Sequence, residues 1–335
     1  MRVGIIGSGF GLYGLLPAFN SLEDCQVISI CGKKTERLVG YCKSIGLTKI
    51  YSSWEEMLQT EDLDAIALAV TPHAQYEIAR VAMKKGIHIF AEKPLTATYA
   101  EAKELLAIAK KNKIITAVDF IFPEIDEWQK VKQLLDEEVY GKLKHISVQW
   151  DFLSYDIRNK LASWKSDIAE GGGALSYYVS HVLYYVELYG GEIAKTKSIF
   201  SYSQKKNKKR GESGIDMILT FKNGMSGQVH FSSSAVGVNK HQVIFLCEKA
   251  TLILESNEGV TENFMLTVCT LEQKQKVSLT KSKRTSKKED ERVAVIKKIA
   301  KRFIHGVKNN THIRPSFVEG VRVQKLIESI RAEAS

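Results

Sequence analysis

The chain has 335 residues, 44% of them apolar and 26% charged, which fits two folded domains and excludes a disordered or low-complexity protein. Its five cysteines form no Cys-x-x-Cys pair, so we expect no zinc site, no disulfide framework and a reducing, cytoplasmic location. We expect no secretory leader at the N-terminus, and apolar runs such as residues 65–70 are too short to span a bilayer.

The net charge of +10 is concentrated in two segments. They contain ten basic residues, namely Lys205, Lys206, Lys208, Lys209, Arg210, Lys281, Lys283, Arg284, Lys287 and Lys288. Removing these ten from the 48 Lys and Arg leaves 38, equal to the 38 Asp and Glu. The segments are either solvated hairpin loops or a polyanion-binding surface. No aromatic platform accompanies the charge, so we predict no nucleic-acid partner and no membrane partner.

The first 120 residues predict a parallel, doubly wound sheet. Short, almost wholly apolar strands are expected over residues 2–6, 26–31, 65–70, 87–91 and 114–118. Helical patterns lie between them over residues 12–21, 35–45, 54–59, 74–85 and 98–112. Alternation of helices with strands that are buried on both faces is typical of α/β proteins. We therefore predict a Rossmann domain over residues 1–120.

The remainder, residues 121–335, predicts an α+β domain with a mostly antiparallel, open sheet. A helix over 124–138, a strand over 142–152 and a helix over 174–188 come first. Strand patterns then run from residue 195 to about 279, with hairpin signals at Asn223-Gly224 and at residues 257–259. Helices over 292–306 and 316–334 follow. We expect this domain to bind substrate, to catalyse and to mediate oligomerisation.

A glycine-rich turn follows the first strand and opens the first helix. It consists of Gly7, Ser8, Gly9, Phe10, Gly11 and Leu12. Gly7 permits a tight turn, Gly9 lets the backbone approach a diphosphate, and the helix N-terminus offers unpaired N–H groups. Leu12 stands where the full G-x-G-x-x-G motif has a small residue, so Gly11 and Gly14 are expected to relieve packing. The alternative is a purely structural turn, but the strand–helix context favours dinucleotide binding.

The end of the second strand discriminates between NAD and NADP. An acidic residue at this point binds the ribose hydroxyls and repels a 2′-phosphate. Here Gly32, Lys33 and Lys34 follow the strand, and no carboxylate is present. These residues predict NADP as the cofactor, with NAD possible. The alternative interpretation is a solvated turn.

Two motifs at the ends of later strands resemble a known family. Thr71, Pro72 and His73 follow one strand, and Glu92-Lys93-Pro94 follows the next. Together with the glycine turn, this ordered set resembles the glucose–fructose oxidoreductase, inositol dehydrogenase and MocA (Gfo/Idh/MocA) family. The resemblance implies that Thr71, Pro72, His73, Glu92 and Lys93 bind the cofactor, with Lys93 near the nicotinamide.

The resemblance continues beyond the first domain. Trp164-Lys165-Ser166-Asp167 is similar to the family's W-R-x-D, and Gly171-Gly172-Gly173 through His181 is similar to G-G-G-x-L-x-D-x-G-x-H. Four departures are evident: Tyr177 replaces the family's Asp, Val179 a small residue, Lys165 an Arg, and Asp119-Phe120 the family's Asn-Arg. The active site is thus partly rebuilt, and the family's substrate does not transfer directly.

Alcohol oxidation needs a hydride acceptor, a base for the hydroxyl proton and a cation for the developing alkoxide. His181 can exchange a proton near neutral pH, and Lys93 supplies a positive charge worth about 3 kcal/mol in a site without water. Tyr177 lies four residues before His181 and is expected on the same helix face. We expect Lys93, His181 and Tyr177 to be catalytic, and these three residues with Asp119 and Trp164 to bind substrate.

Each assignment has a structural alternative. His181 and Tyr177 lie in an aromatic helix and are alternatively core residues, and Trp164 is alternatively packed. Asp119 contacts either substrate or backbone, while Asp167 is expected to be a cap and His73 a turn residue. The predicted function is hydride transfer between NAD(P) and a hydroxyl or carbonyl carbon of a sugar, cyclitol or sugar derivative. The alternatives are a non-catalytic dinucleotide-binding regulator and a polyanion-binding module. The family resemblance also implies a homo-oligomer.

Overall fold

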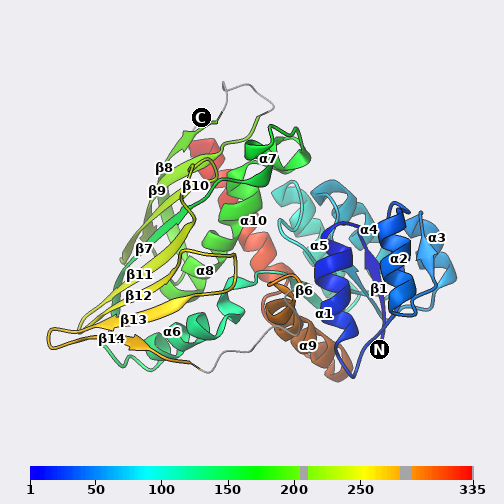
Figure 1. Cartoon of the computed structure of the whole chain (residues 1–335), viewed down its shortest axis with the longest axis horizontal. Helices are drawn as coiled ribbons and strands as arrows, with labels where there is room; N and C mark the ends of the chain where they lie inside the picture. Colours follow the sequence, from blue (N-terminus) through cyan, green and yellow to red (C-terminus); the bar gives the residue numbers. More distant parts are fainter. Residues whose placement is uncertain (204–209, 280–288, 334–335) are drawn as a thin grey trace. The chain divides into compact units, whose positions relative to one another are not determined.

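The computed structural model describes residues 1–203, 210–279 and 289–333, and it divides the chain into two compact units (Figure 1). The first unit comprises Met1–Ile121 and Arg284–Gln324, and the second comprises Phe122–Lys283 and Lys325–Ser335. Apart from Arg210, the basic residues of the two charged segments lie outside the described ranges. Each described helix is too short or too polar to serve as a transmembrane span.

The first unit contains a six-stranded parallel sheet with the order β3-β2-β1-β4-β5-β6. Its strands are β1 (Arg2–Ile6), β2 (Gln26–Cys31), β3 (Ile50–Tyr51), β4 (Ala65–Leu68), β5 (His88–Ala91) and β6 (Thr116–Val118). This order is that of a Rossmann fold, and it brings all the carboxyl ends of the strands to one edge. The predicted fold class is confirmed; the two-residue strand β3 was not predicted, because so short a segment has no periodicity of its own.

Helices cover the sheet on both sides. They are α1 (Leu16–Asn20), α2 (Glu36–Ser44), α3 (Trp54–Thr60), α4 (Pro72–Lys84), α5 (Tyr99–Lys111) and α9 (Val293–Asn309). Thr35, Ser53 and Thr98 accept a backbone hydrogen bond at the starts of α2, α3 and α5. A π-helical turn, η1 (Gly11–Leu15), precedes α1, where a single continuous helix was expected.

Helix α9 belongs to the first unit although it lies near the C-terminus of the chain. It packs on α1, β5 and β6. Phe303 contacts Phe19 and Phe90 edge to face, with ring centroids 6.4 and 5.9 Å apart. Residues 289–324, which we expected in the second domain, are therefore part of the first unit and contribute to its hydrophobic core.

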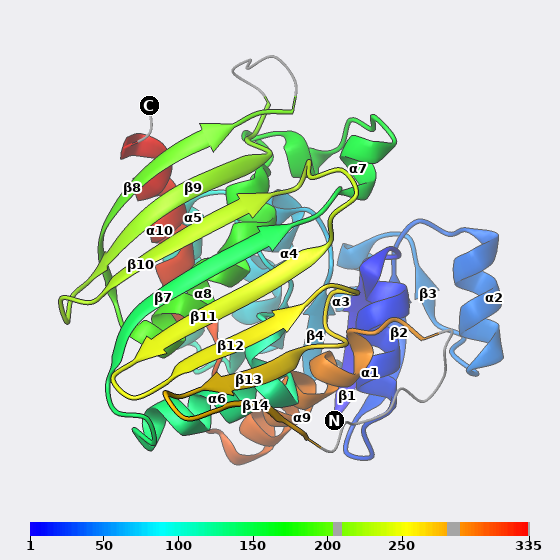
Figure 2. The same cartoon turned by 60° about the vertical axis from the view of Figure 1, so that its left-hand side comes forward.

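The second unit contains an eight-stranded sheet with the order β14-β13-β12-β11-β7-β10-β9-β8 (Figure 2). Its strands are β7 (Leu143–Asp151), β8 (Ile193–Ser201), β9 (Gly214–Phe221), β10 (Ser226–Ser232), β11 (Lys240–Cys247), β12 (Thr251–Ser256), β13 (Met265–Cys269) and β14 (Lys274–Val277). Neighbouring strands are antiparallel except for the parallel pair of β7 and β10. The hairpins predicted at Asn223-Gly224 and at residues 257–259 are confirmed.

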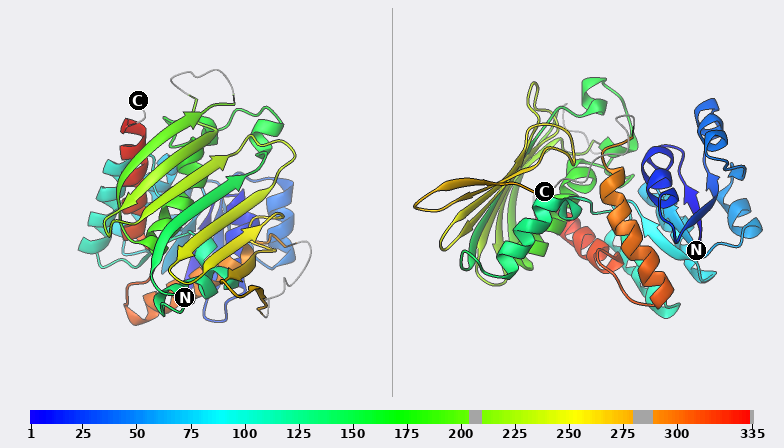
Figure 3. Two further views of the ribbon diagram at one scale, coloured as in Figure 1. Left: turned by 90° about the vertical axis from the view of Figure 1, so that its left-hand side faces the viewer. Right: turned by 60° about the horizontal axis from the view of Figure 1, so that its bottom comes forward.

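The helices of this unit lie on one face of the sheet. They are α6 (Asp126–Asp136), α7 (Tyr155–Arg158), α8 (Ser180–Gly190) and the second half of α10 (Phe317–Glu333), with short turns η2 (Phe122–Glu124), η3 (Trp164–Ser166) and η4 (Leu175–Val179). Alternate strand residues face these helices and are buried, as in the pattern of β9. In the left view of Figure 3, the face of the sheet that carries no helices is turned toward the viewer.

Candidate active site

The glycine turn lies at the carboxyl edge of the parallel sheet. The Gly7 amide donates to the Cys31 carbonyl at 2.8 Å, which ties the turn to the end of β2. Gly7 has φ +126°, and a side chain there would collide with the Ala69 carbonyl. A methyl group on Gly9 would meet no described atom within 4 Å. The turn thus presents an open backbone surface that fits a diphosphate group.

Two further glycines perform the packing function that Leu12 does not. Leu12 is buried in the core. Gly11 lies against the first strand, where a methyl group would be 3.3 Å from Ile5 Cγ2. Gly14 lies directly under the Phe10 ring, which leaves no space for a side chain. The expected relief of packing by Gly11 and Gly14 therefore matches the geometry.

Arg292, from the C-terminal segment of the first unit, stands beside the glycine turn. Its guanidinium carbon lies 4.0 Å from the centroid of the Phe10 ring. Its Nε and Nη2 donate to the two Asp290 carboxylate oxygens at 2.8 and 2.7 Å. No sequence motif identifies this cation, because it is distant from the turn in the chain.

At Gly32, the first residue after β2, there is no space for a side chain. A methyl group on Gly32 would lie 2.6 Å from Ser8 Cβ, so a carboxylate at this position is sterically excluded. Lys33 and Lys34 follow and are exposed. The Arg37 guanidinium lies 5.3 Å from the Tyr13 ring centroid, which adds a third cation to this surface.

Helix α4, which follows β4, anchors the loop that carries Lys93. Thr71 precedes α4, Pro72 begins it, and His73 Nδ1 lies 3.5 Å from Glu101 Oε1. The buried Gln75 side chain donates from Nε2 to the carbonyls of Glu92, Pro94 and Leu95, at 2.7, 3.2 and 2.9 Å. One amide group therefore fixes the path of the backbone on both sides of Lys93.

Glu92 and Asp119 emerge next to each other from β5 and β6. The strands pair Ala91 with Val118, and the Asp119 amide donates to the Ala91 carbonyl at 2.9 Å. Asp119 is 2% exposed, whereas Glu92 and Lys93 are half-buried. Burial, together with the nearby Glu92 carboxylate, raises the pKa of Asp119 well above its usual range.

In the second unit, a buried ion pair organises the start of the helix that carries His181. Glu212 Oε1 accepts from the Leu175 amide at 2.8 Å and from Arg331 Nη2 at 2.8 Å. Arg331 also donates to the Gly172 carbonyl at 2.7 Å. Gly173 has φ +89° and lies so close to both charged groups that no side chain fits. Glu212 and Arg331 were not predicted, since no sequence motif identifies either residue.

Tyr177 lies in the π-helical turn η4 among other aromatic and basic groups. Its ring centroid is 5.5 Å from that of Trp164 and 4.6 Å from that of Tyr178, both edge to face. Lys165 Nζ lies 4.9 Å from the same centroid. Asp167 Oδ1 accepts from the Ala169 amide at 3.0 Å, which confirms the predicted capping role. Tyr177, Trp164 and Lys165 therefore form one cluster.

His181, in the first turn of α8, is buried and contacts Phe122 edge to face at 5.1 Å. A second histidine, His241, stacks on Trp150 at 4.5 Å and lies 3.1 Å from the Tyr185 hydroxyl through Nε2. Burial lowers the pKa of His241 to about 3, so this imidazole is neutral. His181 and His241 thus pack against the same ring, that of Phe122.

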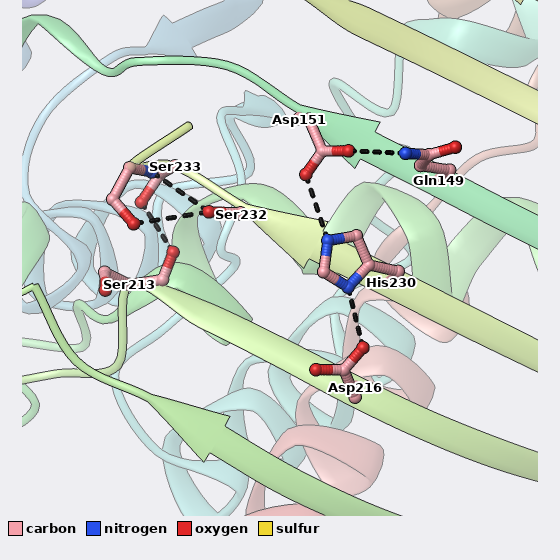
Figure 4. Close-up of polar contacts among 8 residues, drawn as sticks. Gln149, Asp151, Ser213, Asp216, His230, Ser232 and Ser233 are labelled. Atoms are coloured by element: carbon pink, nitrogen blue, oxygen red, sulfur yellow. Dashed lines mark hydrogen bonds and ion pairs between the residues drawn. The ribbon is translucent and has the colours of Figure 1, made fainter. Parts of the chain in front are cut away.

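A third histidine lies on the opposite face of this sheet, away from the helices. Figure 4 shows His230 of β10 between Asp151 of β7 and Asp216 of β9. Its Nδ1 is 2.6 Å from Asp216 Oδ1, and its Nε2 is 3.1 Å from Asp151 Oδ1. Gln149 donates to the other Asp151 oxygen at 2.8 Å. Although burial opposes it, these two carboxylates raise the pKa of His230.

The first unit therefore brings its predicted cofactor-binding residues and Asp119 to one edge of the parallel sheet, and the second unit groups Tyr177 with Trp164. Within the described ranges, no three His, Cys, Asp or Glu side chains gather as a metal site would require.

Two family models match this chain. The model of the oxidoreductase family with an NAD-binding Rossmann fold matches residues 1–120, and the Gfo/Idh/MocA C-terminal domain matches residues 128–253. The chain belongs to the Gfo/Idh/MocA family. It is an NAD(P)-dependent oxidoreductase, and its first unit carries the nucleotide-binding domain.

Three individual proteins illustrate what this chain is similar to. An uncharacterised oxidoreductase from Synechocystis sp. is 29% identical over 77% of this chain and 72% of its own length. Levoglucosan dehydrogenase in complex with NADH and levoglucosan has a TM-score of 0.86 and 20% identity, over 100% of this chain and 97% of its own. A 3-ketoreductase from Actinomadura kijaniata in complex with NADP and TDP-benzene has a TM-score of 0.81 and 19% identity, over 99% and 97%.

Proposed function

We propose that the protein reversibly transfers a hydride between NAD(P) and a hydroxyl or carbonyl carbon of a sugar, cyclitol or sugar derivative. One observation carries this proposal: the open glycine turn and Lys93 lie at the same edge of one parallel sheet. Ligands of open α/β sheets bind at this edge. The substrate class is supported by the levoglucosan and TDP-benzene complexes of the two structural relatives.

The bound nicotinamide supplies hydride chemistry, and the side chains supply binding, charge and proton exchange. The residues proposed to hold it are those of the glycine turn, Gly32 to Lys34, Thr71 to His73, Glu92 and Lys93. Lys93 stabilises negative charge on the substrate oxygen through its ammonium group. His181 accepts the hydroxyl proton in oxidation and returns it in reduction. Tyr177 orients the substrate or His181, while Asp119 and Trp164 contact substrate.

We propose NADP as the preferred dinucleotide. The contact between Gly32 and Ser8 excludes an acidic side chain at the position that would repel a 2′-phosphate. Lys33, Lys34 and Arg37 place positive charge on the following turn and helix. These features support binding of the additional phosphate of NADP. NAD is the second dinucleotide that we propose for the same glycine turn.

The proposed site is tested by dinucleotide titration followed by an activity screen with sugars, cyclitols and nucleotide-linked sugars. In Lys93→Ala and His181→Asn, kcat is expected to fall about 100-fold or more, because each variant removes a charge or a proton-exchanging group. NADPH binding should persist in His181→Asn. Lys111→Ala, on the exposed side of α5, and His145→Asn, on β7, are the matched controls.

The same screen distinguishes an enzyme from a non-catalytic, dinucleotide-binding regulator with the same fold. Dinucleotide binding without turnover of any compound would favour the regulator, which the departures at Tyr177 and Asp119 make the second candidate. Full activity in Lys93→Ala or His181→Asn would contradict the assigned roles.

We further propose a homo-oligomer, a dimer or tetramer, formed through the sheet face of the second unit that faces away from its helices. This face carries exposed apolar side chains on neighbouring strands, with Ile199 75% and Ile218 64% exposed. Light scattering should show a multiple of the 37.6 kDa chain mass and dissociation of Ile218→Lys. A monomeric wild type would refute the proposal.

A further inference from the structure

The carboxyl edge of β5 and β6 contains a feature that hydride transfer alone does not require. Asp119 is buried at the end of the edge strand, whose Val118 amide donates to the Pro315 carbonyl at 3.2 Å. Gly320 closes the same region, because a methyl group there would be 2.8 Å from Leu95 and 3.2 Å from Val118. Asp119 is thus buried next to the point where the C-terminal segment of the first unit packs against the end of β6.

The Asp119 carboxyl group lies beside that of Glu92, because Ala91 pairs with Val118 and the two acidic residues follow these partners directly. Two ionised carboxylates contain no donor, so a hydrogen bond between them requires one shared proton. Among the described groups, Glu92 Oε1 and Asp119 Oδ1 are buried and accept no hydrogen bond, so a second ionised group would lack donors. The other charged groups facing Asp119 are Lys93 and Arg292, and Arg292 is paired with Asp290.

This pair lies beside the proposed cofactor-binding ammonium. Glu92 Oε2 accepts from the Lys93 amide at 3.2 Å, and Gln75 fixes the carbonyls on both sides of Lys93. The backbone therefore holds Lys93 next to two carboxyl groups. With one proton, the pair bears a single negative charge that matches the single positive charge of Lys93.

We propose that Asp119 and Glu92 share one proton, and that this acid pair makes Asp119 a positioning residue that sets the charge facing Lys93. The inference rests on the proposed function, since it assigns to Lys93 the role of electrostatic stabiliser. It adds to the substrate contact proposed above for Asp119.

The first test is infrared difference spectroscopy of the full chain without substrate. Wild type should show the carbonyl stretch of a protonated carboxylic acid at neutral pH, and Asp119→Asn should lose it. Asp62→Asn, an exposed aspartate of the same unit, is the control and should retain the band. Absence of the band in wild type, or its persistence in Asp119→Asn, overturns the proposal.

The second test measures the reactivity of the Lys93 amine by competitive acylation at one fixed pH, followed by peptide mass spectrometry. In Glu92→Gln the labelling of Lys93 relative to exposed Lys111 should rise about tenfold, because the negative charge beside the ammonium group is lost. In Asp119→Asn the labelling should stay close to wild type, since Glu92 keeps its charge.

Equal labelling of Lys93 in Glu92→Gln and wild type, or equal changes in both variants, overturns the assignment. Circular dichroism verifies that each variant is folded. Both measurements are independent of turnover. If they succeed while no sugar, cyclitol or derivative is converted, the acid pair stands and the hydride-transfer proposal fails.

Discussion

The two units place their candidate site residues by different means. In the first unit, short parallel strands end at one edge, and the residues that follow them are brought together by the sheet itself. In the second unit, Tyr177 and His181 lie on a helix whose start is held by the ion pair of Glu212 and Arg331. A sheet edge depends on many backbone hydrogen bonds, whereas the helix start depends on one buried pair of charges. The second arrangement should therefore be more sensitive to a single substitution.

The largest effect is expected from Glu212→Ala. This variant leaves Arg331 without its buried partner and the Leu175 amide without an acceptor, which should lower the free energy of unfolding by about 3–5 kcal/mol. Glu192→Ala, which removes an exposed pair with Lys222, is the control and should cost less than about 1 kcal/mol. Urea unfolding measures both. A similar loss in the two variants would remove the contrast between the units.

Gln75→Leu tests how the first unit holds the Lys93 loop. It leaves three carbonyls without their donor, and we expect a loss of about 2 kcal/mol together with weaker dinucleotide binding. Gln59→Leu, on an exposed position of α3, is the matched control. Unchanged stability and binding would show that the sheet edge alone fixes the loop.

Lys33→Glu tests the nucleotide surface at the end of β2. Replacing a cation with a carboxylate beside the expected 2′-phosphate should lower the ratio of NADPH to NADH affinity about tenfold, equivalent to about 1.4 kcal/mol. Fluorescence titration of the two dinucleotides gives the ratio. Glu36→Lys, at the start of α2, should act in the opposite direction. An unchanged ratio in Lys33→Glu would refute the NADP preference.

The smallest effect is expected at His230. Its pKa is raised in the folded protein, so its stabilising contribution is present below the unfolded pKa, about 6.5, and is lost as the pH rises through the folded pKa. The side chain is 47% exposed, which limits the effect to less than about 1 kcal/mol. His230→Asn should lower the urea midpoint at about pH 5.5 and have little effect at about pH 9. A loss that does not vary with pH would exclude a charged imidazole.

The sequence by itself determined the Rossmann fold class, the mostly antiparallel second sheet, the glycine turn and the family. These features rest on local patterns: apolar strands, helix caps such as Thr98, and Asn223-Gly224. Only the tertiary structure showed that Arg292 reaches Phe10, that Glu212 meets Arg331 and that Asp119 lies beside Glu92. These contacts join residues distant in the chain, so their charge and burial depend on how the strands and helices pack rather than on any local pattern.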